Sequence, residues 1–348
     1  MRGWRHRAIP LAAMAIMPAS ANGWRTIDSG ANCPDNLGAF QKGFAMIGGA
    51  RAGLLALAML GTALPAEART LDLKNPADAL TAMRKVQCST RDGEAVVYHW
   101  AGKVFSRVEG EPDRHLFNVE GMNVRTCVTV TDPARGTGFR QVSRELMFYL
   151  DPATGAVLKT WSNPWTGKSV EVVHVANDPV NMRAPQFPIG RDGKPFDLGA
   201  RIEGGKVFMP TEVPLFYANP LGGDYQQWAG NQYHAMEIFD FVAEAADLLD
   251  AGKPRAKPSI AWVRISPFLP WMEMASRPGI LVFNATGGTV EGIAGLPAVI
   301  REQIASTYPT YAAPPPADDA RPNETSWTYF KKRIEAAKSA SAGSGSVR

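Results

Sequence analysis

Histidine and acidic side chains within strand-like segments are the first candidates for chemistry in this sequence. His174 lies in the segment VVHVANDPVN, close to Asn177 and Asp178, whose side chains can orient an imidazole or a ligand. An imidazole titrates near neutral pH and suits a general acid or base. We therefore predict that His174 and Glu237 move a proton. The alternative is a half-buried histidine bonded to a backbone carbonyl.

Three arginines stand among apolar residues of predicted strands. Arg125, Arg144 and Arg264 would each be costly to bury without a partner, so each must be paired or must hold an anion. We predict that Arg144 acts at the catalytic centre with His174 and Glu237. Arg125 and Arg264 are predicted to bind a substrate carboxylate. Structural ion pairs are the alternative explanation.

Aromatic and amide side chains complete the predicted site. Trp161, Trp165, Tyr233 and Trp271 offer an apolar wall, and Asn163 is predicted to orient the ligand together with Asn177 and Asp178. The segment Pro267–Met274 is interrupted by prolines and is rich in Trp and Met. It is interpreted as a lid over the site, a core plug or a membrane-facing loop.

Alternating apolar residues predict that short β-strands position these side chains. Turn residues such as Asp151-Pro152 and Asn163-Pro164 separate them. The predicted strands cover residues 94–100, 104–108, 115–130, 139–150, 156–161, 169–176, 206–209, 231–242, 260–265 and 280–283. In residues 139–150, Arg144 shares a face with Leu146 and Phe148, and Glu145 faces the other side. We expect a mainly β fold with an antiparallel, barrel-like sheet of the calycin or lipocalin type and a partly polar interior.

Helices are predicted only at the margins of this sheet. Residues 75–85 begin with Asn75-Pro76, an N-cap followed by a proline at the first helical position. A second helix is predicted at residues 296–307. The proline-rich strap of residues 309–322 precedes a terminal helix at about 325–340 and a flexible tail.

The N-terminal region has the pattern of an export signal. Lys42 and Arg51 precede an apolar run over residues 52–64, and Ala66-Glu67-Ala68 forms an A-x-A cleavage site. We predict a dispensable extension at 1–45, a signal peptide at 46–68, one β-rich domain at 69–308 and the strap, helix and tail at 309–348. The protein would be periplasmic or secreted after cleavage near Ala68. An uncleaved anchor is the alternative.

Charge and cysteine content agree with a secreted small-molecule protein. Most of the excess positive charge precedes residue 69, and no basic stripe follows it, so nucleic acid is not an expected partner. After cleavage no segment is apolar enough to span a membrane. Cys88 and Cys127 remain as a candidate disulfide or as two buried thiols. The oligomeric state is left open, with a homo-oligomer among the alternatives.

The motifs YLDPATG, TWSNPWTG, VVHVANDPVN and WVRISPFLPWMEMASRPG occur in this order and carry a family resemblance. The chain closely resembles the bacterial and fungal family called domain of unknown function 1838 over roughly residues 71–289. The resemblance implies a domain dominated by β-structure and no assigned activity.

The sequence lacks the motifs of several common enzyme classes. G-x-S-x-G, the P-loop, C-x-x-C and a post-strand G-x-G-x-x-G are absent, so no organic cofactor is expected. No compact histidine spacing predicts a metal site. We expect a cofactor-free lyase or isomerase acting on a small aromatic or apolar carboxylate. The alternatives are a lipocalin-like binding protein for hydrophobic molecules and a structural envelope protein.

Overall fold

The structure is a computed structural model that describes residues 69–181, 184–223, 225, 228, 232–274 and 277–344. The predicted extension and signal peptide lie outside these residues. The elements, in chain order, are α1 (Pro76–Gln87), β1 (Val96–Arg107), β2 (Arg114–Asp132), β3 (Gly136–Leu150), β4 (Thr160–Ser162), β5 (Ser169–Glu171), β6 (Val175–Asn177), β7 (Arg201–Glu203), β8 (Lys206–Ala218), β9 (Gln232–Glu244), α2 (Ala245–Leu248), β10 (Ser259–Ser266), η1 (Pro270–Met272), β11 (Ile280–Val290), η2 (Ile293–Gly295), α3 (Ala298–Ser306), η3 (Pro309–Ala312) and α4 (Ser326–Ser344).

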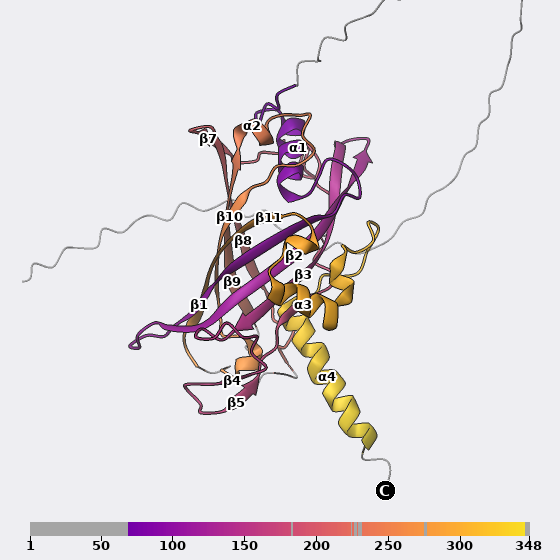
Figure 1. Cartoon of the computed structure of the whole chain (residues 1–348). Coiled ribbons are helices and arrows are strands. Elements are labelled where there is room, and N and C mark those ends of the chain that lie inside the picture. Colours follow the sequence, from indigo (N-terminus) through magenta and orange to yellow (C-terminus); the bar gives the residue numbers. More distant parts are fainter. Residues whose placement is uncertain are drawn as a thin grey trace, which may run out of the picture. The chain divides into compact units, whose positions relative to one another are not determined.

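Nine strands form one antiparallel sheet in the order β6-β3-β2-β1-β11-β10-β9-β8-β7 (Figure 1). Strand β1 lies near the middle and pairs with β2 on one side and with β11, late in the chain, on the other. The sheet is curled: Tyr149 on β3 lies within electrostatic range of Tyr233 on β9 and Arg264 on β10, although several strands separate them in the sheet. The fold is mainly β, as predicted. The sheet does not close into a barrel, so the prediction of a closed sheet is wrong.

Helix α1 covers one end of the concave face of the sheet. Asn75 caps it through hydrogen bonds from Ala77 and Asp78, as the Asn-Pro pair predicts. Its residues Ala82 and Val86 pack with the β8–β9 side of the sheet. Leu80 packs with Cys127 and Phe139 on the β2–β3 side. The helix therefore bridges two distant parts of the curled sheet.

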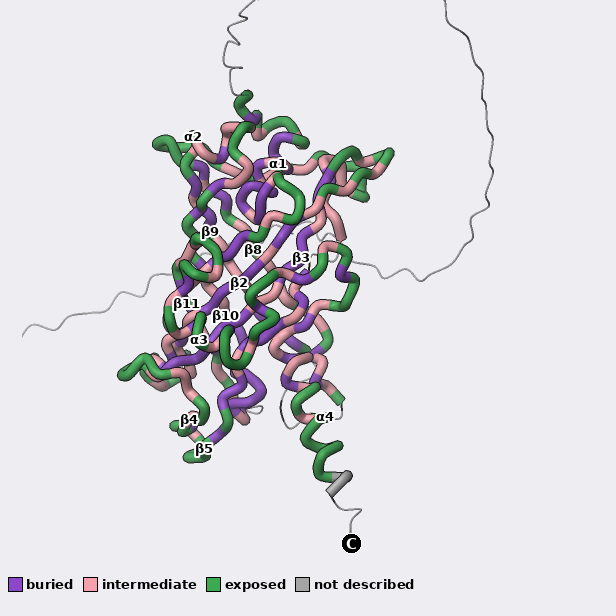
Figure 2. Tube along the Cα trace, turned by 45° about the vertical axis from the view of Figure 1, so that its right-hand side comes forward, coloured by how far each residue is buried: buried purple, intermediate pink, exposed green. Residues whose placement is uncertain are grey.

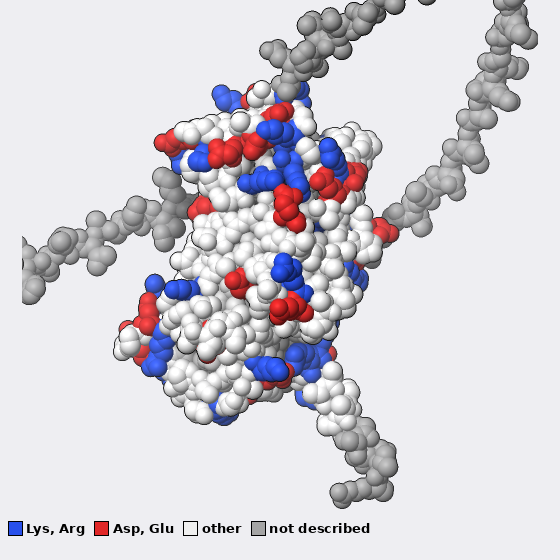
Figure 3. All heavy atoms as spheres, in the orientation of Figure 1, with Lys and Arg blue, Asp and Glu red and all other residues white. Residues whose placement is uncertain are grey.

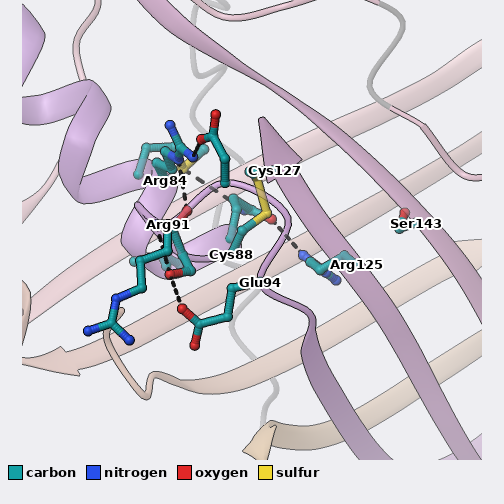
Figure 4. The surroundings of a disulfide bond; sticks show 12 residues. Arg84, Cys88, Arg91, Glu94, Arg125, Cys127 and Ser143 are labelled. Carbon is teal, nitrogen blue, oxygen red and sulfur yellow. Dashed lines mark hydrogen bonds and ion pairs between the residues drawn. A yellow bond between two sulfur atoms is a disulfide. The ribbon is translucent and has the colours of Figure 1, made fainter. Parts of the chain in front are cut away.

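A disulfide fixes this helix to the sheet. Cys88 at the C-terminus of α1 bonds to Cys127 on β2, with an S–S distance of 2.05 Å and a Cα–Cα distance of 5.9 Å. Figure 4 shows the bond with Arg84 and Arg125 in its surroundings. The structure thus selects the disulfide over two free thiols.

The opposite end of the concave face is filled by the segment around η1. Phe268, Leu269, Trp271 and Met272 are all buried there, so this segment is a core plug rather than an exposed loop. The separate hairpin of β4 and β5 lies at the same end, away from α1 (Figure 1). Both ends of the concave face are thus covered by elements outside the nine-stranded sheet.

The convex face of β1, β2 and β3 is covered by α3 and the segment that follows it. Ile300 and Ile304 of α3 and Tyr311 of η3 pack with Met122 and Leu146 of the sheet. Strand β3 is consequently buried on both faces. The predicted helices at 296–307 and 325–340 are confirmed as α3 and α4, whose distal turns are exposed (Figure 2).

Candidate functional site

The strand registers place one set of polar side chains on the concave face. Glu145 on β3 lies opposite Asn123 on β2, which in turn lies opposite Tyr98 on β1. On the other half of the sheet, Arg264 on β10 lies opposite Glu237 on β9. Because opposed residues share a face, the curl of the sheet turns the two sets toward one another.

Glu145 is the most perturbed carboxyl of this group. Burial, and repulsion by Glu237, raise the pKa of Glu145 to about 7, although Arg264, Asn177 and Arg125 stabilise its charged form. The Asn177 side chain forms a hydrogen bond with the carboxyl group from the neighbouring strand β6. Both protonation states are therefore populated at neutral pH, and either form can take part in proton transfer.

Arg264 is held by two side chains of β9. Its Nη1 lies 3.0 Å from Oε1 of Glu237, and its Nη2 donates a hydrogen bond to the hydroxyl of Tyr233. The side chains of Arg264 and Glu237 each keep 18% of their surface exposed, so solvent reaches this part of the concave face. The Nε atom of Arg264 is buried and has no hydrogen-bond partner. One donor of the guanidinium is thus left for a ligand.

Arg125 lies between β2 and the end of α1. Its Nε donates to Oδ1 of Asn123 at 2.7 Å, and Nη1 donates to Oε1 of Gln87 at 2.6 Å. The guanidinium lies over the ring of Tyr98, 4.6 Å from the centroid. Burial lowers the pKa of Arg125, while Tyr98 and Glu145 favour the charged form. The partners of Arg125 are neutral, so its charge is balanced mainly by Glu145.

One cluster on the concave face therefore contains five of the predicted residues together with Glu145, and we call it the charged group. The five predicted members are Arg125, Asn177, Tyr233, Glu237 and Arg264. The sequence reasoning missed Glu145. The alternation in residues 139–150 could have indicated Glu145, because it placed this residue on the face opposite Arg144.

His174 is bound by the backbone on both sides of its ring. Nδ1 accepts a hydrogen bond from the amide of Tyr149 at 3.1 Å, and Nε2 donates to the carbonyl of Leu158 at 3.0 Å. Burial lowers the pKa of His174 to about 4. The ring is therefore neutral at pH 7, with both nitrogens engaged in wall contacts. This geometry matches the alternative of a backbone-bonded histidine.

Arg144 does not face the same interior as Glu237, contrary to expectation. It lies on the convex face of β3, where Nε is 3.0 Å from Oδ2 of Asp178 and Nη1 donates to the carbonyls of Thr310 and Ala313. Asp178 also pairs with Arg321. The reason for the difference is that the segment after α3 buries this face too. Arg144 and Asp178 together hold that segment on the sheet.

The remaining predicted residues lie near the plugged end. Oδ1 of Asn163 accepts from the amides of Trp165 and Thr166, and its Nδ2 donates to the carbonyl of Met272 at 2.9 Å. Nε1 of Trp165 donates to Glu111. These contacts fix the turn against the plug and leave Asn163 away from the charged group.

Two further tryptophans form part of the plug itself. The ring of Trp271 lies 6.1 Å from that of Trp161 and 5.4 Å from that of Tyr149. Tyr149 lies on the same face of β3 as Glu145, four residues further along the strand. Trp161 and Trp271 thus lie at the plugged end of the concave face, where Trp271 contacts Tyr149 on the strand that carries Glu145.

Within the described ranges, no three His, Cys, Asp or Glu side chains gather into a metal-binding cluster. None of the helices in those ranges is long and apolar enough to cross a membrane. On the face drawn in Figure 3, basic and acidic residues are intermingled.

Comparison with known proteins gives a family and no activity. No curated protein and no solved structure matches the chain. Residues 93–334, more than half of the chain, match the family described as protein of unknown function (DUF1838). This range includes every strand of the sheet and all six residues of the charged group. The chain belongs to the DUF1838 family.

Proposed function

We propose that the protein binds a small, mainly apolar carboxylate on the concave face of its sheet and moves a proton on it through Glu145. The observation that carries this proposal is the Glu145 carboxyl, partly buried and with a pKa of about 7, beside Asn177 and within range of two arginines. A general acid or base is most effective when its pKa is near the working pH.

The charges around Glu145 support an anionic ligand. Arg125 and Arg264 are both cationic, whereas Glu237 is the partner of Arg264 alone. When Glu145 is protonated, the group carries one positive charge in excess. A bound carboxylate would supply the missing negative charge, and the unpartnered Nε of Arg264 offers it a donor.

The reaction class that fits is an isomerisation or elimination. As a base, Glu145 would take a proton from a carbon of the ligand. As an acid, it would return that proton to another carbon, or a leaving group would depart. No cofactor is required for either step, and the apolar surroundings keep the carboxyl reactive at neutral pH.

The alternative proposal is a carrier that binds the same ligand without catalysis. One observation favours it: His174 is tied to the backbone and Glu237 to Arg264, so two of the predicted proton-transfer residues are engaged in the wall. In this case Glu145 would only adjust the charge of the concave face.

Deuterium exchange distinguishes the two proposals. The protein is incubated in D₂O with a panel of small aryl and alkenyl carboxylates, and deuterium uptake into carbon positions is measured by mass spectrometry. Glu145→Gln should lose the exchange by at least about a hundredfold, while Glu212→Gln, an exposed carboxyl on the convex face of β8, should retain it. Saturable binding without exchange in the unmodified protein would support the carrier and contradict the enzyme.

We also propose that the protein is exported. The disulfide between Cys88 and Cys127 supports this, because such bonds persist in oxidising compartments. N-terminal sequencing of the protein from its host should find Arg69 as the first residue. A cytoplasmic protein that retains the segment before Arg69 would contradict export.

A further inference from the structure

Two tryptophans of the concave face carry indole N–H groups without acceptors. Nε1 of Trp100 on β1 and Nε1 of Trp262 on β10 are both buried, and neither has a hydrogen-bond partner. The rings lie edge to face, with centroids 6.5 Å apart. Buried tryptophan N–H groups usually find a partner, and an unsatisfied buried donor destabilises the fold. The pair therefore requires an explanation.

The backbone on either side is shaped to hold Trp100. Gly121 on β2 and Gly287 on β11 are its direct neighbours across the sheet. A Cβ atom at Gly121 would overlap the indole ring, and one at Gly287 would lie 2.8 Å from the Trp100 Cβ. Gly121 leaves space that the indole occupies, and Gly287 leaves space for the backbone of His99 and Trp100. The packing of Trp100 against these strands therefore fixes the position of its N–H group.

The neighbouring unsatisfied groups are a further nitrogen donor and a hydroxyl, which can both donate and accept. Nε of Arg264 belongs to the same strand and face as Trp262, and Thr289, on the same strand and face as Gly287, has a buried hydroxyl without a partner. Trp262 itself is only 9% exposed. Indole and guanidinium nitrogens donate and do not accept. The complementary group on a ligand is an oxygen acceptor.

Stacked aromatic rings connect a cavity beside α1 to this pair. A cavity of about 240 Å³ lies beside α1, with Met83, Leu198, Met209 and Phe241 among its lining residues. Phe241 stacks on Phe239 with centroids 5.9 Å apart, and Phe239 stacks on Trp262 at 6.4 Å. A ligand body in contact with these rings would be apolar.

We propose that Trp100 and Trp262 form a donor pair that binds the carbonyl oxygen of an apolar ligand lying along Phe239 and Phe241. The inference rests on the proposed function only in placing a ligand on the concave face, and it does not require proton transfer. It specifies the ligand as an apolar ring or chain that bears a carbonyl oxygen.

Three probes of similar size test the proposal by titration calorimetry on the full chain. They are 2-acetylnaphthalene, which has a ketone oxygen, 2-naphthoate, which has a carboxylate, and 2-ethylnaphthalene, which has no acceptor. The ketone and the carboxylate should bind about tenfold more tightly than the hydrocarbon, as expected for one or two hydrogen bonds.

The variants Trp100→Phe and Trp262→Phe keep an aromatic ring and remove the donor. Each should reduce the ketone preference by about fivefold and change hydrocarbon affinity much less. Trp165→Phe is the control, because its N–H already binds Glu111. An unchanged ketone preference in the double variant, or no saturable binding of any probe, would overturn the proposal.

Indole NMR signals provide a test on the unmodified protein, so it does not depend on whether a variant folds. In the ¹⁵N-labelled protein, the ketone should move two indole N–H resonances downfield, whereas the hydrocarbon should not. Equal shifts with both probes would contradict the donor pair. Glu145→Gln separates this inference from the proposed function, since it should abolish deuterium exchange and keep the ketone preference.

Discussion

At position 145 a carboxyl group shares the concave face with charges of both signs. Glu237 opposes its ionisation, while Arg264, Asn177 and Arg125 favour it, and burial tips the balance toward the protonated form. His174 shows the opposite outcome of burial, because its neutral ring is held between two backbone groups and its pKa falls to about 4. Burial thus disfavours the charged form of both residues, which raises the pKa of the carboxyl and lowers that of the imidazole.

The raised pKa of Glu145 predicts a specific dependence of stability on pH. Between its ordinary value of 4.5 and about 7, the folded protein retains a proton that the unfolded chain releases. The stability that Glu145 contributes is therefore complete below pH 4.5, and it is lost as the pH rises through 7. Glu145→Gln should remove this loss, on the order of 1–3 kcal/mol at pH 8.

Urea unfolding of both proteins from pH 5 to pH 8 measures the difference. The gain of Glu145→Gln over the unmodified protein should increase with pH. Glu212→Gln should show no such trend, because its carboxyl is exposed. A constant difference across the range would contradict the raised pKa.

Among the elements, α1 connects the two halves of the sheet and borders the charged group. Its residue Gln87 accepts a hydrogen bond from Arg125, and the carbonyl of Val86 accepts one from Tyr98. Lys85, fully buried, donates to three backbone carbonyls at the end of α2. The helix is therefore tied to its surroundings by polar contacts as well as by the disulfide.

The disulfide should contribute measurably to stability. It joins residues 39 positions apart, and closing a loop of this length typically stabilises a protein by about 2–4 kcal/mol. The double variant Cys88→Ala/Cys127→Ala should lose this amount in urea unfolding. Reductant should destabilise the unmodified protein and leave the double variant unaffected. Equal stability of the two proteins without reductant would contradict the prediction.

The described part of the chain is built around a curled sheet whose edges are bridged by other elements. The first turn of α4 packs near β6 and also reaches β9, where the ring of Trp327 lies 5.0 Å from that of Tyr233. Trp327 is 2% exposed. Because Tyr233 holds Arg264, α4 connects the C-terminal region to the charged group.

Trp327→Ala should therefore affect both stability and the site. Removing a buried tryptophan typically lowers the free energy of unfolding by about 3–5 kcal/mol. Binding of 2-naphthoate should weaken as well, since Tyr233 loses its packing partner. Ala336→Ser, at an exposed position of the same helix, should change neither quantity. Loss of stability without any loss of binding would show that α4 does not support the site.

Several features of the molecule were predictable because they depend on neighbours in sequence. Asn75 and Pro76 specify the start of α1, and period-two alternation located most strands. Two predictions differ from the structure in this part of the sheet. The separate strands predicted at residues 94–100 and 104–108 form one continuous strand, β1, from Val96 to Arg107. Strand β8 was predicted too short and extends to Ala218, although Pro210 and Pro214 interrupt its pattern. The prolines are compatible with this strand because its outer neighbour β7 is only three residues long.

The sequence by itself therefore determined most of the strands, the turns, the marginal helices and most of the charged residues of the interior. Only the tertiary structure decided which face of β3 lines the interior. Alternation separates Glu145 from Arg144 but assigns neither to a side when both faces are buried, one toward Arg264 and the other beneath the segment after α3. That choice depends on the curl of the sheet and on contacts between residues far apart in the chain, which local sequence patterns do not contain.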